Sequence, residues 1–171
     1  MTALPLTRMK RAPAIAKAAA LCALVGISDA SAFSGFGTAV VEDRDGKPCF
    51  GLPTRTFESL RSPRPLQALT VHRNVNDEAW SFSYHPSPAV LLRPGQCIVY
   101  GELPVSATSP AAPQPLVPGA LYEVYLNAPT SGLIRGYYAK FCLKTLPDGS
   151  TRVIPVRYDE RKGWTAEVCK P

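Results

Sequence analysis

The sequence contains few of the residues and motifs from which active sites are built. Its 171 residues include two histidines. His72 reads as a solvated strand residue on the opposite face from Val71, and His85 has no neighbouring carboxylate to orient it as a base. There is no G-x-S-x-G elbow, no H-E-x-x-H motif and no glycine-rich phosphate loop. The acidic residues Glu42 and Asp43 flank a turn in which neighbouring charges compensate one another. The sequence therefore predicts a protein that is not an enzyme and uses no metal or cofactor.

Charged side chains are also scarce, at 19% of the chain, and the formal net charge is only +6. Half of this excess belongs to the first 32 residues, and the remaining +3 is too weak and too dispersed to predict a nucleic-acid partner. The 18 prolines and 12 glycines fall short of a disordered or collagen-like composition. A single loop-rich globular domain is expected.

Residues 8–32 have the three parts of a secretory signal. A basic start is followed by an apolar run from Ala18 to Ile27 and by Ala30-Ser31-Ala32, a small-x-small cleavage site. The run covers only ~15 Å as a helix, half of the hydrocarbon core, so no stable membrane span is predicted in the mature form. We expect residues 1–32 to be a cleaved signal peptide and residues 33–171 to form the mature domain.

The cysteines indicate an oxidising compartment. Cys22 lies within the signal and follows Leu21, where lipoprotein processing requires a small side chain, so no lipid anchor is expected. No Cys-x-x-Cys pair is present, which argues against zinc binding and thioredoxin-like chemistry. The absence of an N-x-S/T sequon fits a bacterial periplasm. Two disulfides are expected among the four remaining cysteines, Cys49, Cys97, Cys142 and Cys169.

The mature chain is predicted to be all-β, because short runs of β-branched and aromatic residues alternate with turn signals and no 3.6-residue apolar period is present. Asp45-Gly46, Pro94-Gly95 and Asp148-Gly149 mark turns. The segment Pro104 to Pro118 is expected to be an exposed loop that crosses between sheets. The pattern favours a small immunoglobulin-like β-sandwich stapled by two disulfides. The expected strands are Thr38 to Glu42, Pro48 to Leu52, Leu66 to Arg73, Ala79 to Tyr84, Gln96 to Gly101, Leu121 to Asn127, Gly136 to Lys144 and Arg152 to Tyr158.

Period-two alternation assigns faces within these strands. Trp80, Phe82 and Tyr84 share one face, opposite two serines, and are predicted to be core residues. In the strand from Gly136, Phe141 shares a face with the apolar residues, so Cys142 is expected to point away from the core.

This face assignment predicts the disulfide pairing. An outward Cys142 needs a partner outside the core, and Cys169 near the C-terminus can supply it by clamping the tail onto the strand. By exclusion Cys49 would pair with Cys97, although the sequence alone allows three connectivities.

Two groups of residues are candidates for recognition, but the sequence does not identify the partner-binding residues. The run Arg157 to Trp164 mixes charges and is expected to form an exposed turn, with a recognition patch as the alternative, because Arg, Tyr and Trp are enriched at binding hot spots. The second group consists of the tyrosines Tyr122, Tyr125, Tyr137 and Tyr138. Period-two alternation should bury some of them and expose others, but it does not show which exposed ones bind a partner.

An ordered set of motifs covers about Val41 to Val156. The motifs are Asp45-Gly46-Lys47-Pro48-Cys49-Phe50, Leu69-Thr70-Val71 followed by Trp80, Leu92-Arg93-Pro94-Gly95-Gln96-Cys97-Ile98-Val99-Tyr100-Gly101, Leu116-Val117-Pro118-Gly119, Tyr122-Glu123-Val124 and Tyr137-Tyr138-Ala139-Lys140-Phe141-Cys142-Leu143. Together they resemble a family of small bacterial envelope proteins, the type VI secretion immunity periplasmic lipoproteins. The resemblance implies a periplasmic β-sandwich that neutralises a protein toxin by stoichiometric binding and has no catalytic residues. The chain departs from the family pattern at Leu21-Cys22, where a lipidated cysteine should end the signal.

A second function class remains open from the sequence. An envelope protein that donates or accepts a β-strand during fibre assembly would show the same export signal and sandwich pattern. A small secreted hydrolase is a third possibility, and it lacks a recognisable nucleophile and base.

Overall fold

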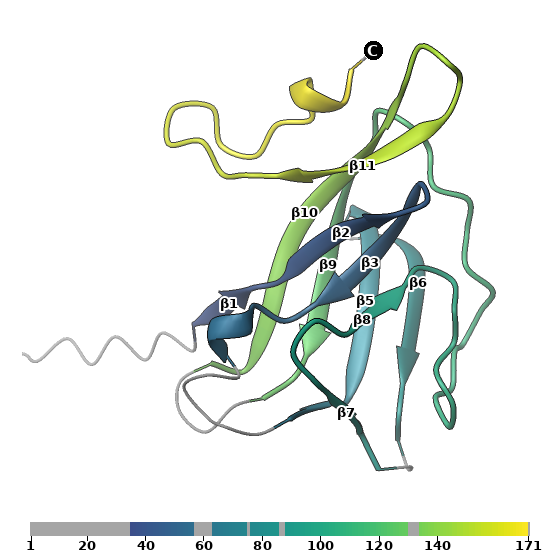
Figure 1. Cartoon of the computed structure of the whole chain (residues 1–171), viewed down its shortest axis with the longest axis vertical. Helices are drawn as coiled ribbons and strands as arrows, with labels where there is room; N and C mark the ends of the chain where they lie inside the picture. The colour runs from purple at the N-terminus through teal and green to yellow at the C-terminus, as the bar shows by residue number, and fades with distance from the viewer. Residues whose placement is uncertain (1–34, 57–62, 75, 86–87, 130–133, 171) are drawn as a thin grey trace, which may run out of the picture. The chain divides into compact units, whose positions relative to one another are not determined.

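The computed structural model describes residues 35–56, 63–74, 76–85, 88–129 and 134–170 (Figure 1). The chain divides after Ala32, and all of these residues belong to the second unit, Phe33–Pro171. The predicted signal peptide, its cleavage site before Phe33 and the lipidation question at Cys22 lie outside the described residues. Within the described ranges, no helix is long and apolar enough to cross a bilayer.

The largest sheet is built around β10 (Gly136–Thr145). One edge of β10 pairs antiparallel with β9 (Leu121–Asn127), which is followed by β5 (Ala68–Asn74) and then by β6 (Asp77–Ser83). The other edge pairs first with β1 (Phe36–Thr38), which runs parallel to β10, and then with β11 (Thr151–Val156), which runs antiparallel. β10 therefore has neighbouring strands on both edges between Tyr137 and Cys142, and its last residues pair with β11 alone.

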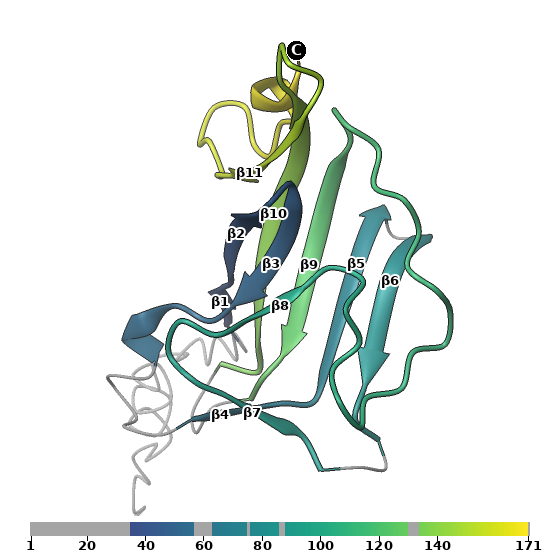
Figure 2. The same cartoon turned by 45° about the vertical axis from the view of Figure 1, so that its right-hand side comes forward.

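A smaller sheet, ordered β2 (Val40–Arg44), β3 (Lys47–Gly51) and β8 (Cys97–Val99), packs over the inner face of the main sheet (Figure 2). The ring of Phe50 on β3 meets that of Phe141 on β10, with centroids 5.3 Å apart. A short third sheet pairs β4 (Arg64–Leu66) with β7 (Val90–Leu92).

The predicted immunoglobulin-like sandwich with two disulfides is confirmed. The order β10-β9-β5-β6 is that of strands G, F, C and C′ in immunoglobulin variable domains, and β2-β3-β8 follows the order of A, B and E. Between the layers lie the residues that alternation assigned to the core, including Trp80 and Phe82, each 2% exposed. Burial of these rings supplies much of the hydrophobic stabilisation of a domain of this size.

The strand boundaries differ from the expected ones mainly at short strands. The expected Leu66 to Arg73 strand is divided at Gln67, whose N–H donates to the carbonyl of Asn127 while its own carbonyl accepts from Tyr84. The residues before Gln67 leave the main sheet as β4 and pair with β7, which the sequence did not predict. Three-residue strands such as β1, β4 and β7 are too short to show a period.

Both disulfides have the predicted connectivity. Cys49–Cys97 joins adjacent strands β3 and β8, with Cα atoms 5.4 Å apart. Cys142–Cys169 joins β10 to the short 3₁₀ helix η2 (Glu167–Cys169), with Cα atoms 6.0 Å apart. One bridge therefore lies within a sheet, and the other holds the C-terminal tail.

The Pro104 to Pro118 loop connects β8 to β9 as predicted, and it also covers the outer edge of β6. Ser83 and Thr108 exchange backbone hydrogen bonds of 2.9 and 2.8 Å, and the N–H of Gln114 donates to the carbonyl of Ala79. The Tyr100 hydroxyl lies 2.7 and 3.0 Å from the carbonyl oxygens of Gln114 and Ala79. Burial, with a smaller contribution from Tyr122, raises the pKa of Tyr100 to about 12. The edge of β6 is thus already engaged and is not free to pair with another strand.

Candidate interaction surface

The outer face of the main sheet carries aromatic residues that the core does not use. Because side chains alternate along β9 and β10, Tyr122 and Tyr137 are buried, whereas Tyr125 and Tyr138 lie half-buried on the outer face. Tyr125 and Tyr138 are directly opposite each other in the register of the two strands. The four tyrosines that the sequence could not assign are divided in this way between the two faces.

The chain after β11 folds back toward β10 through a tight turn. The N–H groups of Asp159 and Gly163 donate to each other's carbonyl oxygens, at 3.2 and 2.7 Å. Asp159 Oδ1 accepts from the N–H groups of Arg161 and Lys162, at 2.8 and 2.9 Å. Gly163 has a φ of 67°, a left-handed conformation that glycine adopts without strain. The expected exposed turn is confirmed, and it returns Trp164 to the face of β10.

Five aromatic side chains on the outer face form two contacting groups, which together we call the outer aromatic cluster. The ring centroids of Phe36 and Tyr125 are 5.4 Å apart, those of Tyr138 and Trp164 are 6.1 Å apart, and those of Tyr158 and Trp164 are 5.6 Å apart. Each pair is arranged edge to face, the preferred geometry for aromatic rings. Phe36 and Tyr158 are each about 60% exposed and Trp164 is 37% exposed. The cluster consists of Phe36, Tyr125, Tyr138, Tyr158 and Trp164.

A glycine in β10 gives Tyr125 its place in this cluster. A Cβ added at Gly136 would lie 2.5 Å from the Tyr125 hydroxyl oxygen and within 2.7 Å of ring carbon atoms. Real Cβ atoms do not approach other atoms so closely, so the Tyr125 ring lies directly over the bare backbone of Gly136. From there the ring reaches Phe36 on β1.

An ion pair lies beneath Trp164. Lys140 Nζ donates to Glu123 Oε1 at 2.7 Å and lies 5.5 Å from the centre of the Trp164 ring, within the range of a cation–π contact. Burial by itself raises the pKa of Glu123, but the hydrogen bond and charge of Lys140 outweigh it and hold the pKa below its ordinary value. Burial by itself lowers the pKa of Lys140, but hydrogen bonds with Glu123 and Tyr138 raise it. Both groups therefore stay charged over a wide pH range.

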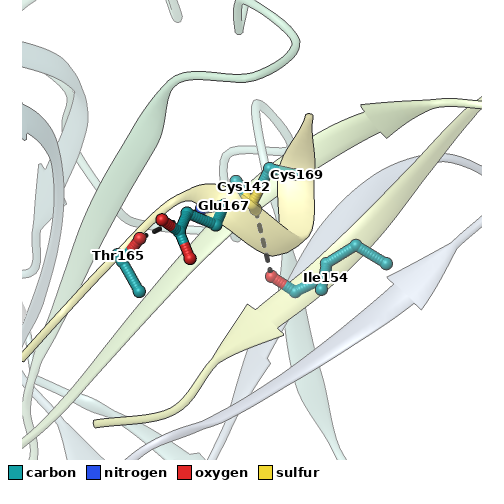
Figure 3. Close-up of a disulfide and its surroundings, with 5 residues drawn as sticks. All are labelled: Cys142, Ile154, Thr165, Glu167 and Cys169. Carbon is teal, nitrogen blue, oxygen red and sulfur yellow. Dashed lines mark hydrogen bonds between the residues drawn. A yellow bond between two sulfur atoms is a disulfide. The ribbon is translucent and has the colours of Figure 1, made fainter. Parts of the chain in front are cut away.

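The Cys142–Cys169 disulfide fixes the tail on the same face (Figure 3). Both cysteines are almost fully buried, in a small apolar cluster that also contains Val156 and Ile154. The turn before η2 is closed by the N–H of Glu167, which donates to Thr165 Oγ1 at 3.2 Å. A hollow of about 400 Å³ lies between β11 and this tail. The tail is held at its end by the bridge and in its middle by Trp164.

The other residues singled out in the sequence lie on different segments of the fold. His72 lies on the outer face as predicted but is half-buried, opposite Glu123 in the register, and its Nδ1 is buried without a hydrogen-bond partner. His85 is exposed. Asp43 is more than part of a solvated turn, because its carboxylate accepts from the N–H groups of Gly46 and Val153 and links β2 to β11. No group of three or more His, Cys, Asp or Glu side chains within the described ranges could hold a metal ion.

Comparison with family models finds none that matches the chain, and comparisons with curated proteins and with solved structures likewise find no match. What the outer aromatic cluster can bind is therefore inferred from its own chemistry. Half-buried to exposed aromatic rings on one face, next to arginine and lysine, have the composition of a protein-binding hot spot.

Three contributors to this surface were not identified from the sequence. Phe36 belongs to a strand of only three residues, and its contact with Tyr125 depends on the parallel pairing of β1 with β10. Lys140 and Glu123 carry opposite charges on two predicted strands, and this is the signal that could have suggested their pairing. Strand register, which the sequence does not specify, decides whether the two side chains meet.

Proposed function

We propose that the mature chain is a periplasmic immunity protein that neutralises a type VI secretion toxin by stoichiometric binding, without catalysis. The observation that carries this proposal is the outer aromatic cluster, two groups of half-buried to exposed rings on the outer face of the main sheet. Strands hold Phe36, Tyr125 and Tyr138, and the Cys142–Cys169 bridge holds the tail that carries Trp164, so ordering these rings on binding should cost little free energy. The family resemblance of the motifs from Val41 to Val156 supports the same conclusion.

Export to the periplasm is part of this proposal. The two disulfides fit an oxidising compartment, and the signal pattern of residues 8–32 supplies the route. Intact-mass measurement of protein recovered from the periplasm tests this part. We expect a chain that begins at Phe33 and carries no lipid, and a mass that includes diacylglycerol on Cys22 would contradict it.

The alternative, an envelope protein that exchanges a β-strand during fibre assembly, is less well supported. Strand exchange requires a free sheet edge. The edge of β6 is engaged by the Pro104 to Pro118 loop. On β11, the N–H of Val153 donates to Asp43, and Pro155 has no N–H to offer.

The test is protection of cells against a toxin. The protein is co-expressed in the periplasm with the toxin-domain protein encoded by the adjacent gene, and the complex is purified. We expect survival of the cells and a 1:1 complex of nanomolar affinity, about −12 kcal/mol. Cell death with no complex would contradict the proposal, and an adjacent cluster of fibre-assembly genes would favour the alternative.

Matched variants locate the binding surface. Replacing Trp164 and Tyr158 with alanine should weaken the complex by at least about 2 kcal/mol, roughly 30-fold, because these rings are the best hot-spot candidates. Leu91→Ala is the control, since Leu91 is 57% exposed on β7, which is not part of the main sheet. If the control weakens binding and the aromatic variant does not, the surface is wrongly placed.

A further inference from the structure

The positive charge of the mature domain is concentrated at one end of the sequence. Residues 135–170, which form β10, β11 and the tail, contain eight basic and four acidic side chains, a net charge of +4. Residues 33–134 contain seven basic and eight acidic side chains, a net charge of −1. The segment that contributes Tyr138, Tyr158 and Trp164 to the outer aromatic cluster therefore also carries the whole positive excess of the domain.

Within this segment, two basic residues lie directly opposite each other. Lys144 on β10 and Arg152 on β11 are register partners, and both share the outer face with Cys142. Opposed residues of antiparallel strands bring their Cβ atoms to roughly 5 Å, and like charges at that separation destabilise a sheet. A glutamate at either position would stabilise the hairpin. The pair is thus unfavourable for folding, and a role in binding would account for it.

Among the described residues, the neighbouring carboxylates form no ion pair with Lys144 or Arg152. Asp148, in the turn between β10 and β11, accepts hydrogen bonds from Ser150. Asp159 is occupied by backbone N–H groups of its own turn, and Glu167 pairs with Lys162 at 3.3 Å. Among the residues that the structure describes, no ion pair involves Lys144, Arg152, Arg157 or Arg161.

We propose that the partner of this protein presents an acidic protein surface to a basic edge that follows β11, with Lys144 and Arg152 at its start and Arg157 and Arg161 beyond its end, where the rings of Tyr158 and Trp164 lie. This inference rests on the proposed function and specifies the chemistry of the toxin surface. From Tyr138 to Lys144 the outer face of β10 extends about 20 Å, which suits a protein interface of standard size. Opposite charge on the partner would relieve the repulsion between Lys144 and Arg152 and would accelerate association.

An anionic bilayer offers negative charge too, but the pattern on this surface favours a protein. The carboxylates of Glu123, Glu160 and Glu167 lie among the basic residues. A bilayer surface is uniformly negative and would repel them, whereas a folded partner can match a mixed pattern group by group.

The experiment separates folding from binding with single charge reversals. K144E and R152E each convert the like-charged pair into an opposite pair, so each should raise the melting temperature by about 1–3 °C. The same variants should weaken binding to the purified toxin-domain protein of the adjacent gene at least tenfold, mainly through slower association. R157E/R161E should also weaken binding tenfold or more. The control is R93E, a reversal at an exposed arginine outside β10, β11 and the tail, and it should change affinity by less than twofold.

Two further measurements are the salt dependence of binding and binding to lipid vesicles. Wild-type affinity for the toxin-domain protein should fall at least tenfold between 50 and 300 mM NaCl, because exposed charges are screened. This inference would be overturned if salt left the wild-type affinity unchanged, or if the charge-reversal variants bound the toxin-domain protein as tightly as wild type does. In that case, protection of cells by the wild type would still support the proposed function. Binding to vesicles containing phosphatidylglycerol, but not to the toxin-domain protein, would assign the basic edge to a membrane. A wild type that neither binds the toxin-domain protein nor protects cells would overturn both proposals.

Discussion

The two disulfides stabilise different parts of the molecule. Cys49–Cys97 joins β3 to β8 inside the smaller sheet, and its chain separation of 48 residues includes β4 to β7. Cys142–Cys169 has a separation of 27 residues and attaches a tail to the outer face of β10. The first bridge supports the hydrophobic core, and the second holds the proposed binding surface. Removing each bridge should therefore have different consequences.

The largest effect is expected for C49A/C97A. In the chain-entropy model a loop of this length stabilises the folded state by about 4 kcal/mol, a large share of the roughly 5–15 kcal/mol of a small domain. Urea unfolding of the mature domain should show this loss for the domain as a whole. A loss smaller than that of C142A/C169A would contradict the distinction between the two bridges.

The next largest effect is the difference in stability loss between substitutions on the inner and the outer face of β9. Leu126 is fully buried on the inner face, so Leu126→Ala should cost about 3 kcal/mol by leaving a cavity. Tyr125, its neighbour on the outer face, is half-buried, and Tyr125→Ala should cost about 1 kcal/mol. Thermal unfolding of the two variants compares them directly. Equal losses would mean that the outer aromatic cluster is as important for folding as the core.

C142A/C169A should destabilise the domain by about 2 kcal/mol, which is less than the length of the loop closed by this bridge predicts. The reason is that the tail can detach while β10 remains paired on both edges. The measurable signature is local. Hydrogen exchange should accelerate in residues 157–170 and not in β9 or β5. Faster exchange in the core strands would show that this bridge also supports the sandwich.

The smallest expected effect is the loss of the stability that the ion pair of Lys140 and Glu123 contributes. Because the pKa of Glu123 is lowered in the folded state, its contribution to stability is present above the ordinary carboxyl pKa and is lost as the pH falls from about 5 to about 3. Glu123 is partly exposed, so the loss should be only about 0.5 kcal/mol. The raised pKa of Lys140 means that its contribution is lost only at strongly alkaline pH. The free energies of unfolding of Glu123→Gln and wild type, measured across this pH range, should converge at low pH. A difference that stays constant with pH would show that the ion pair is not the source of the stability difference.

Alternation and cysteine placement were enough to predict the faces of the strands, the burial of Trp80 and the pairing of Cys142 with Cys169. These features are local, because the side-chain period of a strand is two and an outward cysteine needs an outward partner. Strand β9 has the bounds that the sequence predicted. Short strands such as β4 and β7 could not be predicted, since three residues show no period.

The tertiary structure alone decided which residues form the proposed binding surface. Phe36, Tyr125 and Trp164 come from three distant parts of the sequence, and only strand register and the turn after β11 place them on the same face of the main sheet. Register depends on pairing between remote segments, whose free energy is a sum of many small contacts. The opposition of Lys144 and Arg152 arises in the same way. The sequence by itself determined a two-disulfide β-sandwich because alternation is written into each strand, whereas the composition of its outer face depended on how the strands were paired.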